Sequence, residues 1–210
     1  MDVKNIEQLV ETGEYLPLME AFYTIQGEGH HTGKAAYFIR VGGCDVGCHW
    51  CDVKESWNPK LHPPTDIETI ITEAEKYSKT IVITGGEPLT WDMTKLTDGL
   101  KQKGFQIHIE TSGAYPLSGT WDWICLSPKK RMLPKPGIYN HVDELKVIVY
   151  NKSDFKFAEE QAALLQTDAE LYLQPEWSVR EKMMPLIVDY VMANPRWKIS
   201  LQTHKYLRIP

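Results

Sequence analysis

Three cysteines stand close together in the chain, Cys44, Cys48 and Cys51, in a loop that follows a predicted strand. Their CxxxCxxC spacing suits three kinds of site. A structural zinc ion needs four protein ligands, so His49 or a distant residue would have to complete the set. A redox pair would use Cys48 and Cys51 and leave Cys44 without a role. An iron–sulfur cube normally takes four thiolates, so three cysteines leave one iron with the open position that a catalytic site requires.

Other short motifs follow predicted strands in the same way. GGEP (residues 85–88) closes the strand at residues 80–84, and GGC (42–44), TSG (111–113), SPK (127–129) and QPE (174–176) each follow another strand. Taken alone, GGEP would be an ordinary turn. Because loops at the carboxyl ends of parallel strands converge on one crevice, we expect these motifs to share one site with the cysteines.

The elements that must position these motifs are predicted from hydrophobic periodicity. Strands are predicted at residues 18–25, 36–41, 80–84, 105–109, 123–126, 144–150, 170–173 and 197–201. Helices are predicted at residues 65–77, 93–103, 154–165 and 178–193. We expect Thr65 to be the N-cap of the first helix, Ser178 to open the last, and Pro185 to interrupt or kink it.

Strand and helix alternate from about residue 65 onward, which indicates right-handed βαβ units and a largely parallel sheet. The chain is too short for eight complete units. We therefore predict an α/β fold in the form of a partial, open (β/α) barrel. No repeat or linker interrupts it, so residues 1–210 are interpreted as a single domain.

Composition excludes several classes of protein. With 210 residues, 42% of them hydrophobic, and a net charge of −5, the chain is globular and carries no basic stripe for nucleic acid; Lys129, Lys130 and Arg131 form only a short basic trio. No apolar run has membrane-spanning length, and the first ten residues are charged where a signal peptide is apolar, so we expect no membrane partner and a cytoplasmic location. Cys125 stands apart and is expected to be a small buried hydrophobic residue.

Cysteine spacing and GGEP together resemble the radical S-adenosylmethionine (SAM) superfamily, as does Trp50, the aromatic residue before Cys51. The resemblance implies a [4Fe-4S] cluster on the three cysteines and SAM chelated to the open iron through its amino and carboxylate groups. Trp50 would lie beside the adenine, and GGEP would meet the SAM ammonium with Glu87 as a compensating charge. The reaction would begin with one electron from an external donor and proceed through a 5′-deoxyadenosyl radical.

Further motifs resemble the 7-carboxy-7-deazaguanine synthase family from about Met19 to the last residue. They are YTIQGEG (23–29), FIR (38–40), CDVK (51–54), ETSG (110–113), SPK (127–129) and QTHKYLRIP (202–210). That family contracts the ring of 6-carboxy-5,6,7,8-tetrahydropterin to 7-carboxy-7-deazaguanine with loss of ammonia, in queuosine and other 7-deazapurine biosynthesis. The resemblance also implies a homodimer.

The same resemblance assigns residues to each ligand. The pterin would contact Ile25, Gln26, Gly27, Glu28, Arg40, Thr84, His204 and Pro210, the last through its terminal carboxylate. SAM would contact Trp50, Cys51, Asp52, Gly86, Glu87, Ser112, Ser127, Pro128, Lys129 and Gln174.

Elementary chemistry agrees with two of these assignments. A pterin has a donor-rich amino edge, which suits the carboxylate of Glu28, and its carboxylate suits the guanidinium of Arg40. The alternatives are that Glu28 is a turn residue, that Arg40 is a surface arginine of a strand, and that His204 is a packed, hydrogen-bonded residue.

One position departs from the family. Members commonly have Thr or Ser after the CysAsp pair, and that hydroxyl contributes to a Mg²⁺ site, whereas this chain has Val53. Valine offers no oxygen to a cation that prefers oxygen ligands. We expect Mg²⁺, where it binds, to use substrate oxygens and waters near Asp52 or Ser56, with a weaker effect on activity than is usual in the family.

Two other functions fit the cysteine motif. An activase that makes a glycyl radical on a partner protein shares the spacing and the size, although the compact polar C-terminus and the QGEG loop argue against it. The other is a scaffold protein that holds zinc or an iron–sulfur cluster without catalysis.

Overall fold

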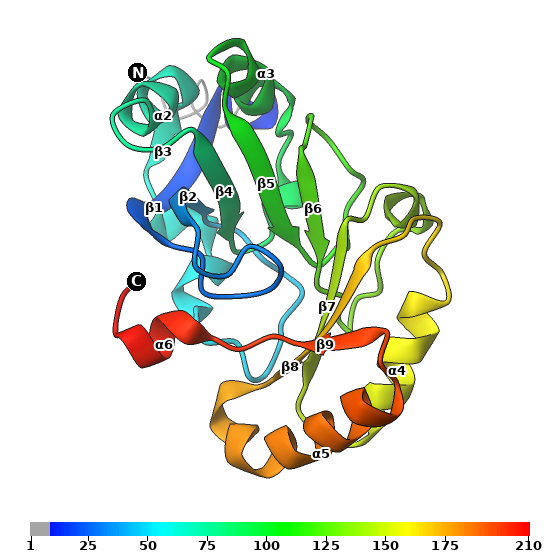
Figure 1. Ribbon diagram of the computed structural model, residues 1–210. Coiled ribbons are helices and arrows are strands. Elements are labelled where there is room, and N and C mark those ends of the chain that lie inside the picture. The colour runs from blue at the N-terminus through cyan, green and yellow to red at the C-terminus, as the bar shows by residue number, and fades with distance from the viewer. Residues whose placement is uncertain (1–8) are drawn as a thin grey trace.

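The computed structural model describes residues 9–210, and its strands join in one nine-stranded sheet (Figure 1). They are β1 (Tyr15–Ile25), β2 (Ala35–Val41), β3 (Pro64–Asp66), β4 (Thr80–Gly85), β5 (Gln106–Thr111), β6 (Trp123–Leu126), β7 (Glu144–Val149), β8 (Glu170–Pro175) and β9 (Trp197–Ile199). Their order is β3-β1-β2-β4-β5-β6-β7-β8-β9. β1 is antiparallel to both β2 and β3, and every pair from β2 to β9 is parallel.

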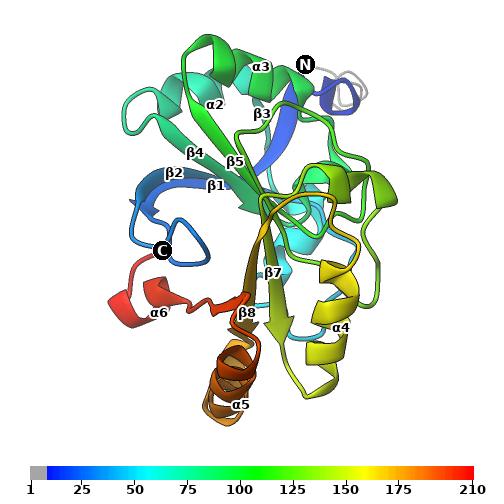
Figure 2. The same cartoon turned by 45° about the vertical axis from the view of Figure 1, so that its right-hand side comes forward.

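The sheet curves without closing, since β3 and β9 are its two edges (Figure 2). The helices are α2 (Ile67–Ala74), α3 (Thr94–Gln102), α4 (Ser153–Ala162), α5 (Arg180–Ala193) and α6 (Thr203–Leu207). Buried residues of α2 and α3 pack with β1, β2, β4 and β5, and those of α4 and α5 pack with β6 to β9. The predicted α/β fold, a partial, open barrel with a largely parallel sheet, is confirmed.

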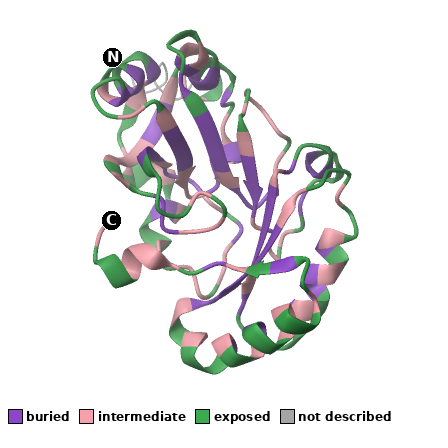
Figure 3. Ribbon diagram, in the orientation of Figure 1, coloured by how far each residue is buried: buried purple, intermediate pink, exposed green. Residues whose placement is uncertain are grey.

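The two faces of the sheet differ in chemistry because side chains alternate along a strand. On β7, Leu145, Val147 and Val149 belong to the hydrophobic core, whereas Glu144 and Lys146 point to the inner face. Figure 3 shows the strands as the most buried part of the molecule. The outer face is therefore an ordinary core under the helices, and the inner face places buried polar groups around the interior of the barrel.

The predicted start of the first helix, with Thr65 as its N-cap, is wrong. Thr65 lies in the short strand β3, where it pairs with Leu16, and the helix begins at Ile67. Asp66 is the N-cap, with its carboxylate accepting a hydrogen bond from the backbone N–H of Thr69 at 3.1 Å. A carboxylate is a strong N-cap, so the helix starts one residue after it.

The last long helix also starts later than expected. A 3₁₀ turn (Trp177–Val179) precedes α5, and the carboxylate of Glu176, not Ser178, caps that turn. Pro185 lies inside α5, which continues through it to Ala193. In residues 9–210 no helix is both long and apolar enough to cross a membrane.

Candidate active site

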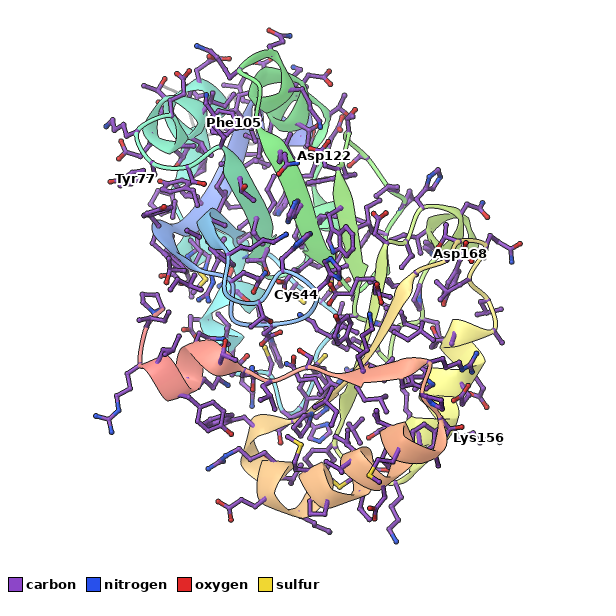
Figure 4. The ribbon with its side chains drawn as sticks, viewed as in Figure 1. Cys44, Tyr77, Phe105, Asp122, Lys156 and Asp168 are labelled. Carbon is purple, nitrogen blue, oxygen red and sulfur yellow. The ribbon has the colours of Figure 1, made fainter. Side chains whose placement is uncertain are left out.

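A cavity of about 270 Å³ lies inside the open barrel, at the carboxyl ends of the parallel strands. Cys44 lies near the centre of the molecule in Figure 4, far from peripheral residues such as Tyr77 and Lys156. All the predicted site residues except Pro128 line this one cavity: Ile25, Gln26, Gly27, Glu28, Arg40, Cys44, Cys48, Trp50, Cys51, Asp52, Thr84, Gly86, Glu87, Ser112, Ser127, Lys129, Gln174, His204 and Pro210. Pro128 is buried between two residues that do line it.

The loop that carries the three cysteines is held by backbone hydrogen bonds. Gly43 N–H donates to the Ser56 carbonyl at 2.6 Å, and Cys44 N–H donates to the Trp57 carbonyl at 3.2 Å. All four cysteines are free thiols, and Cys44, Cys48 and Cys51 are half-buried in the cavity wall. Burial raises the pKa of the Cys44 and Cys48 thiols, so a bound cation is needed to hold them as thiolates at neutral pH.

The geometry separates the metal alternatives. Across residues 9–210, no three His, Cys, Asp or Glu side chains lie close enough together to share a single metal ion. His49, the nearest candidate for a fourth zinc ligand, is exposed and packs its ring edge-on against Tyr150, with 5.0 Å between centroids. Cys44, Cys48 and Cys51 line one cavity, and a cube takes each thiolate on a different iron. The cysteine set therefore fits a [4Fe-4S] cluster.

GGEP packs directly against the cysteine loop. Gly86 N–H donates to the Val41 carbonyl at 2.8 Å, and Glu87 N–H donates to the Gly43 carbonyl at 2.8 Å. A Cβ atom on Gly86 would lie 2.3 Å from the Gly43 carbonyl oxygen, which no side chain tolerates. Glycine at position 86 is thus required for the two segments to meet.

The carboxylate of Glu87 is buried and fully engaged by the chain itself. It accepts hydrogen bonds from Ser112 N–H at 2.7 Å, Ser112 Oγ at 2.5 Å, Thr111 Oγ1 at 2.5 Å and Leu89 N–H at 3.1 Å. Glu87 therefore positions the loop after β5 as well as placing a negative charge in the cavity wall.

Lys129 and Trp50 form the adjoining part of the wall. The ammonium of Lys129 lies 5.8 Å from the centre of the Trp50 ring and donates hydrogen bonds to the Ser127 carbonyl and, at 2.7 Å, to Ser127 Oγ. Burial lowers the pKa of Lys129. Arg131 donates to the Gly47 carbonyl at 3.1 Å, which ties this loop to the cysteine loop.

Another part of the cavity wall is a buried network around the loop between β1 and β2. Gln26 Nε2 donates to Glu110 Oε1 at 2.8 Å, and Glu28 accepts from Lys146 Nζ at 2.6 Å and from Gln202 Nε2 at 2.9 Å. Burial alone would raise the pKa of Glu28, but the charge and hydrogen bond of Lys146, with that of Gln202, lower it to about 2. Glu28 is thus a held anion and not a free turn residue.

Sequence reasoning missed Lys146, and it gave no role to Glu110 or Gln202, although both belong to motifs that it identified. The signal for Lys146 was a pair of charged residues at alternate positions, 144 and 146, in a strand that is otherwise apolar. In a parallel strand covered by helices, such a pair marks the inner face of the barrel.

The C-terminal segment crosses the open side of the barrel, where Figures 1 and 2 both place α6 beside the β1–β2 loop. Thr203 N–H donates to the Gly27 carbonyl at 2.8 Å. A Cβ atom on Gly27 would lie 2.3 Å from Nδ1 of His204, so the imidazole packs directly on that glycine. The ring lines the cavity, and its burial there lowers its pKa. Lys205 Nζ donates to Asp52 Oδ2 at 2.9 Å, which links α6 to the cysteine loop.

Arg40 is half-buried on the inner face of β2. Its Nη1 donates to Glu20 Oε1 of the neighbouring strand at 2.7 Å, and its guanidinium lies 5.0 Å from the centre of the Phe22 ring. These contacts hold the guanidinium at the cavity wall and use only one of its nitrogens, so the rest of the fork is left for a ligand in the cavity that Arg40 lines.

The residues near position 53 do not fit a Mg²⁺ site. Val53 lines the cavity without an oxygen, Ser56 Oγ donates to the Val53 carbonyl at 2.6 Å, and the Asp52 carboxylate is paired with Lys205. A hard cation prefers several oxygen ligands, and here the side-chain oxygens are engaged elsewhere.

Cys125 is buried as expected. It is 4% exposed on the inner face of β6, and its thiol donates to Glu144 Oε1 at 3.5 Å. Burial, with the nearby Glu144 carboxylate, raises the pKa of this thiol well above its usual value.

Comparison with known proteins gives one consistent result. Residues 38–125 match the model of the radical SAM superfamily. The chain is 68% identical to 7-carboxy-7-deazaguanine synthase of Flavobacterium psychrophilum over the full length of both, and 46% identical to that of Synechocystis sp. over 92% of this chain and 93% of the other. The crystal structure of QueE from Escherichia coli superposes with a TM-score of 0.79 at 30% identity, covering 92% of this chain and 96% of that one.

Proposed function

Since this chain belongs to the 7-carboxy-7-deazaguanine synthase family of radical SAM enzymes, we propose that it converts 6-carboxy-5,6,7,8-tetrahydropterin to 7-carboxy-7-deazaguanine and ammonia. The reaction serves queuosine and related 7-deazapurine biosynthesis. One observation carries the proposal: the three-cysteine loop and GGEP line the same cavity as the Gln26–Glu28 loop and Arg40.

The wall with the cysteines suits the cofactors. Cys44, Cys48 and Cys51 would hold the [4Fe-4S] cluster, and Trp50, Ser112 and Lys129 would line the SAM site, with Asp52, Gly86, Glu87, Ser127, Pro128 and Gln174 around it. When bound, the cluster and SAM supply the one-electron chemistry that starts hydrogen abstraction from the substrate. An external one-electron donor completes the set of partners.

The wall with Glu28 suits the pterin. The Glu28 carboxylate is an acceptor for the amino edge, and the free nitrogens of Arg40 are donors for the substrate carboxylate. Ile25, Gln26, Gly27, Thr84, His204 and Pro210 would complete the contacts. Polar groups at both ends of a flat ligand fix its orientation relative to the cofactor wall.

We extend the proposal to the state of the protein in the cell. The family supports a homodimer, and a site built on free thiols suits the reducing cytoplasm. We also treat residues 1–210 as one domain, because every described strand joins the same sheet; residues 1–8 of that range lie outside the described residues. We assign no step to Mg²⁺.

The test is anaerobic turnover by the purified, reconstituted protein with SAM, a one-electron reductant and 6-carboxy-5,6,7,8-tetrahydropterin. We expect 7-carboxy-7-deazaguanine and ammonia to appear only when SAM is present. Turnover without a second protein excludes the glycyl radical activase. A protein with an intact cluster that leaves the pterin unchanged would refute the proposed function.

A further inference from the structure

Lys146 is a buried cation that none of the assigned ligand contacts uses. It lies on the inner face of β7 with a side chain only 3% exposed, and it lines the cavity. Its ammonium is 2.6 Å from Glu28 Oε2 and 3.4 Å from Glu110 Oε2. A buried ammonium is costly unless it is paired and hydrogen-bonded, and here it has both kinds of partner.

Titratable groups surround this pair on every element packed against it. Glu110 lies on β5, Cys125 on β6, Lys129 on the loop after β6, Glu144 on β7 itself, and His204 on α6 near Glu28. Burial alone would lower the pKa of Lys146, but Cys125, Glu110, Glu28 and Glu144 raise it well above its usual value. Lys146 is therefore charged throughout the physiological pH range and is the cation that directly contacts Glu28.

The contact has a consequence for Glu28. Each of its oxygens is fixed by one donor, Lys146 on Oε2 and Gln202 on Oε1. A carboxylate has about four acceptor directions, so two donors leave acceptor capacity on the same oxygens for a ligand. Without the lysine, burial would favour the protonated acid, which turns one acceptor into a donor.

We propose that Lys146 is a positioning residue for substrate recognition: it holds Glu28 as an oriented anion that accepts hydrogen bonds from the donor edge of the pterin. The inference rests on the proposed function, because it needs a ligand with N–H donors at this wall. Lys146 acts through Glu28 and has no contact of its own with the reacting atoms.

The test measures the Kd of 6-carboxy-5,6,7,8-tetrahydropterin for the anaerobic holoenzyme, without reductant, from pH 8 to pH 6. In the wild type, Glu28 stays ionised over this range. In Lys146→Met, the pKa of Glu28 rises, so Glu28 protonates as the pH falls and binding weakens. We expect the ratio of Kd at pH 6 to Kd at pH 8 to be at least about fivefold larger than in the wild type. His204 also responds to the charge of Glu28, so its contribution is measured separately in a Glu28→Gln background.

Two further variants make the result specific. Lys198→Met removes an exposed strand lysine that pairs with Glu170, and it should leave the Kd profile unchanged. In a Glu28→Gln background, Lys146→Met should add less than about twofold to Kd, since the group through which it acts is gone.

A double variant that leaves the net buried charge unchanged serves as a control for misfolding. If Lys146→Met does not fold, Glu110→Gln/Lys146→Met is compared with Glu110→Gln, because it removes one anion with the cation. A pH profile parallel to the wild type, or an equal loss of binding in the Glu28→Gln background, overturns the inference. A wild-type holoenzyme that neither binds nor converts the pterin overturns the proposed function instead.

Discussion

Replacing Glu87 with glutamine tests the internal support of the cofactor wall. The change keeps the size of the side chain and removes the charge and one acceptor oxygen. Four donors converge on the native carboxylate: Leu89 N–H and Thr111 Oγ1 on one oxygen, and Ser112 N–H and Oγ on the other. The amide nitrogen of the variant would face Ser112 N–H, donor against donor, at a position that is only 1% exposed in the native protein.

The magnitude follows from those contacts. A buried N–H left without an acceptor costs about 1–3 kcal/mol, and a bond to a neutral group is weaker than one to a charged group by roughly 1 kcal/mol. Ser112 Oγ can turn to accept from the new amide, and relaxation recovers part of the loss. We therefore expect Glu87→Gln to lower the free energy of unfolding by about 3 kcal/mol.

The assay is urea unfolding of the anaerobic holoproteins. With a slope of about 3 kcal/mol per molar urea, the midpoint should fall by about 1 M. Asp92→Asn is the matched control, because the Asp92 carboxylate also accepts from a backbone N–H and a hydroxyl, those of Thr94, but at an exposed position. Equal midpoints for Glu87→Gln and the wild type would refute the reasoning.

Three further predictions concern single residues. Arg40→Lys should raise KM for the pterin about tenfold with kcat little changed, because an ammonium cannot replace a planar fork; an unchanged KM would make Arg40 structural. Val53→Thr should increase stimulation of turnover by Mg²⁺, since it adds the missing oxygen; titration with Mg²⁺ and no added stimulation would contradict this. Burial lowers the pKa of His108 to about 4 from 6.5, so the unfolded chain takes up a proton in that window and stability falls as pH falls. His108→Gln should flatten this pH dependence in urea unfolding, and an unchanged slope would count against it.

Much of the fold follows from local pattern. The alternation of buried strands with amphipathic helices predicted the open, parallel barrel, and the rule that loops meet at strand ends predicted the shared cavity. Strand β3 was missed because its three residues, Pro64–Asp66, pair only through contact with distant Tyr15–Pro17. Helix α6 was missed because its five residues carry too short a pattern.

Motifs in the sequence predicted the residues of the site, but they did not predict the residues that pair with them. Cys44 and Gly86 belong to recognisable segments, but Lys146 pairs with Glu28 across 118 positions and Lys205 pairs with Asp52 across 153. The curvature of the open sheet brings such partners together, and the sequence does not show which residue pairs with which. The carboxylates of Glu28 and Asp52 are both ion-paired in the structure, and the sequence did not indicate either partner.

The cluster on three cysteines is tested most directly by iron and acid-labile sulfide analysis of anaerobically reconstituted wild type and four Cys→Ala variants. We expect about four irons and four sulfides per chain in the wild type and in Cys125→Ala. Cys44→Ala, Cys48→Ala and Cys51→Ala should each fail to assemble the cluster. Loss of the cluster in Cys125→Ala, or one zinc and no iron in the wild type, would contradict the assignment.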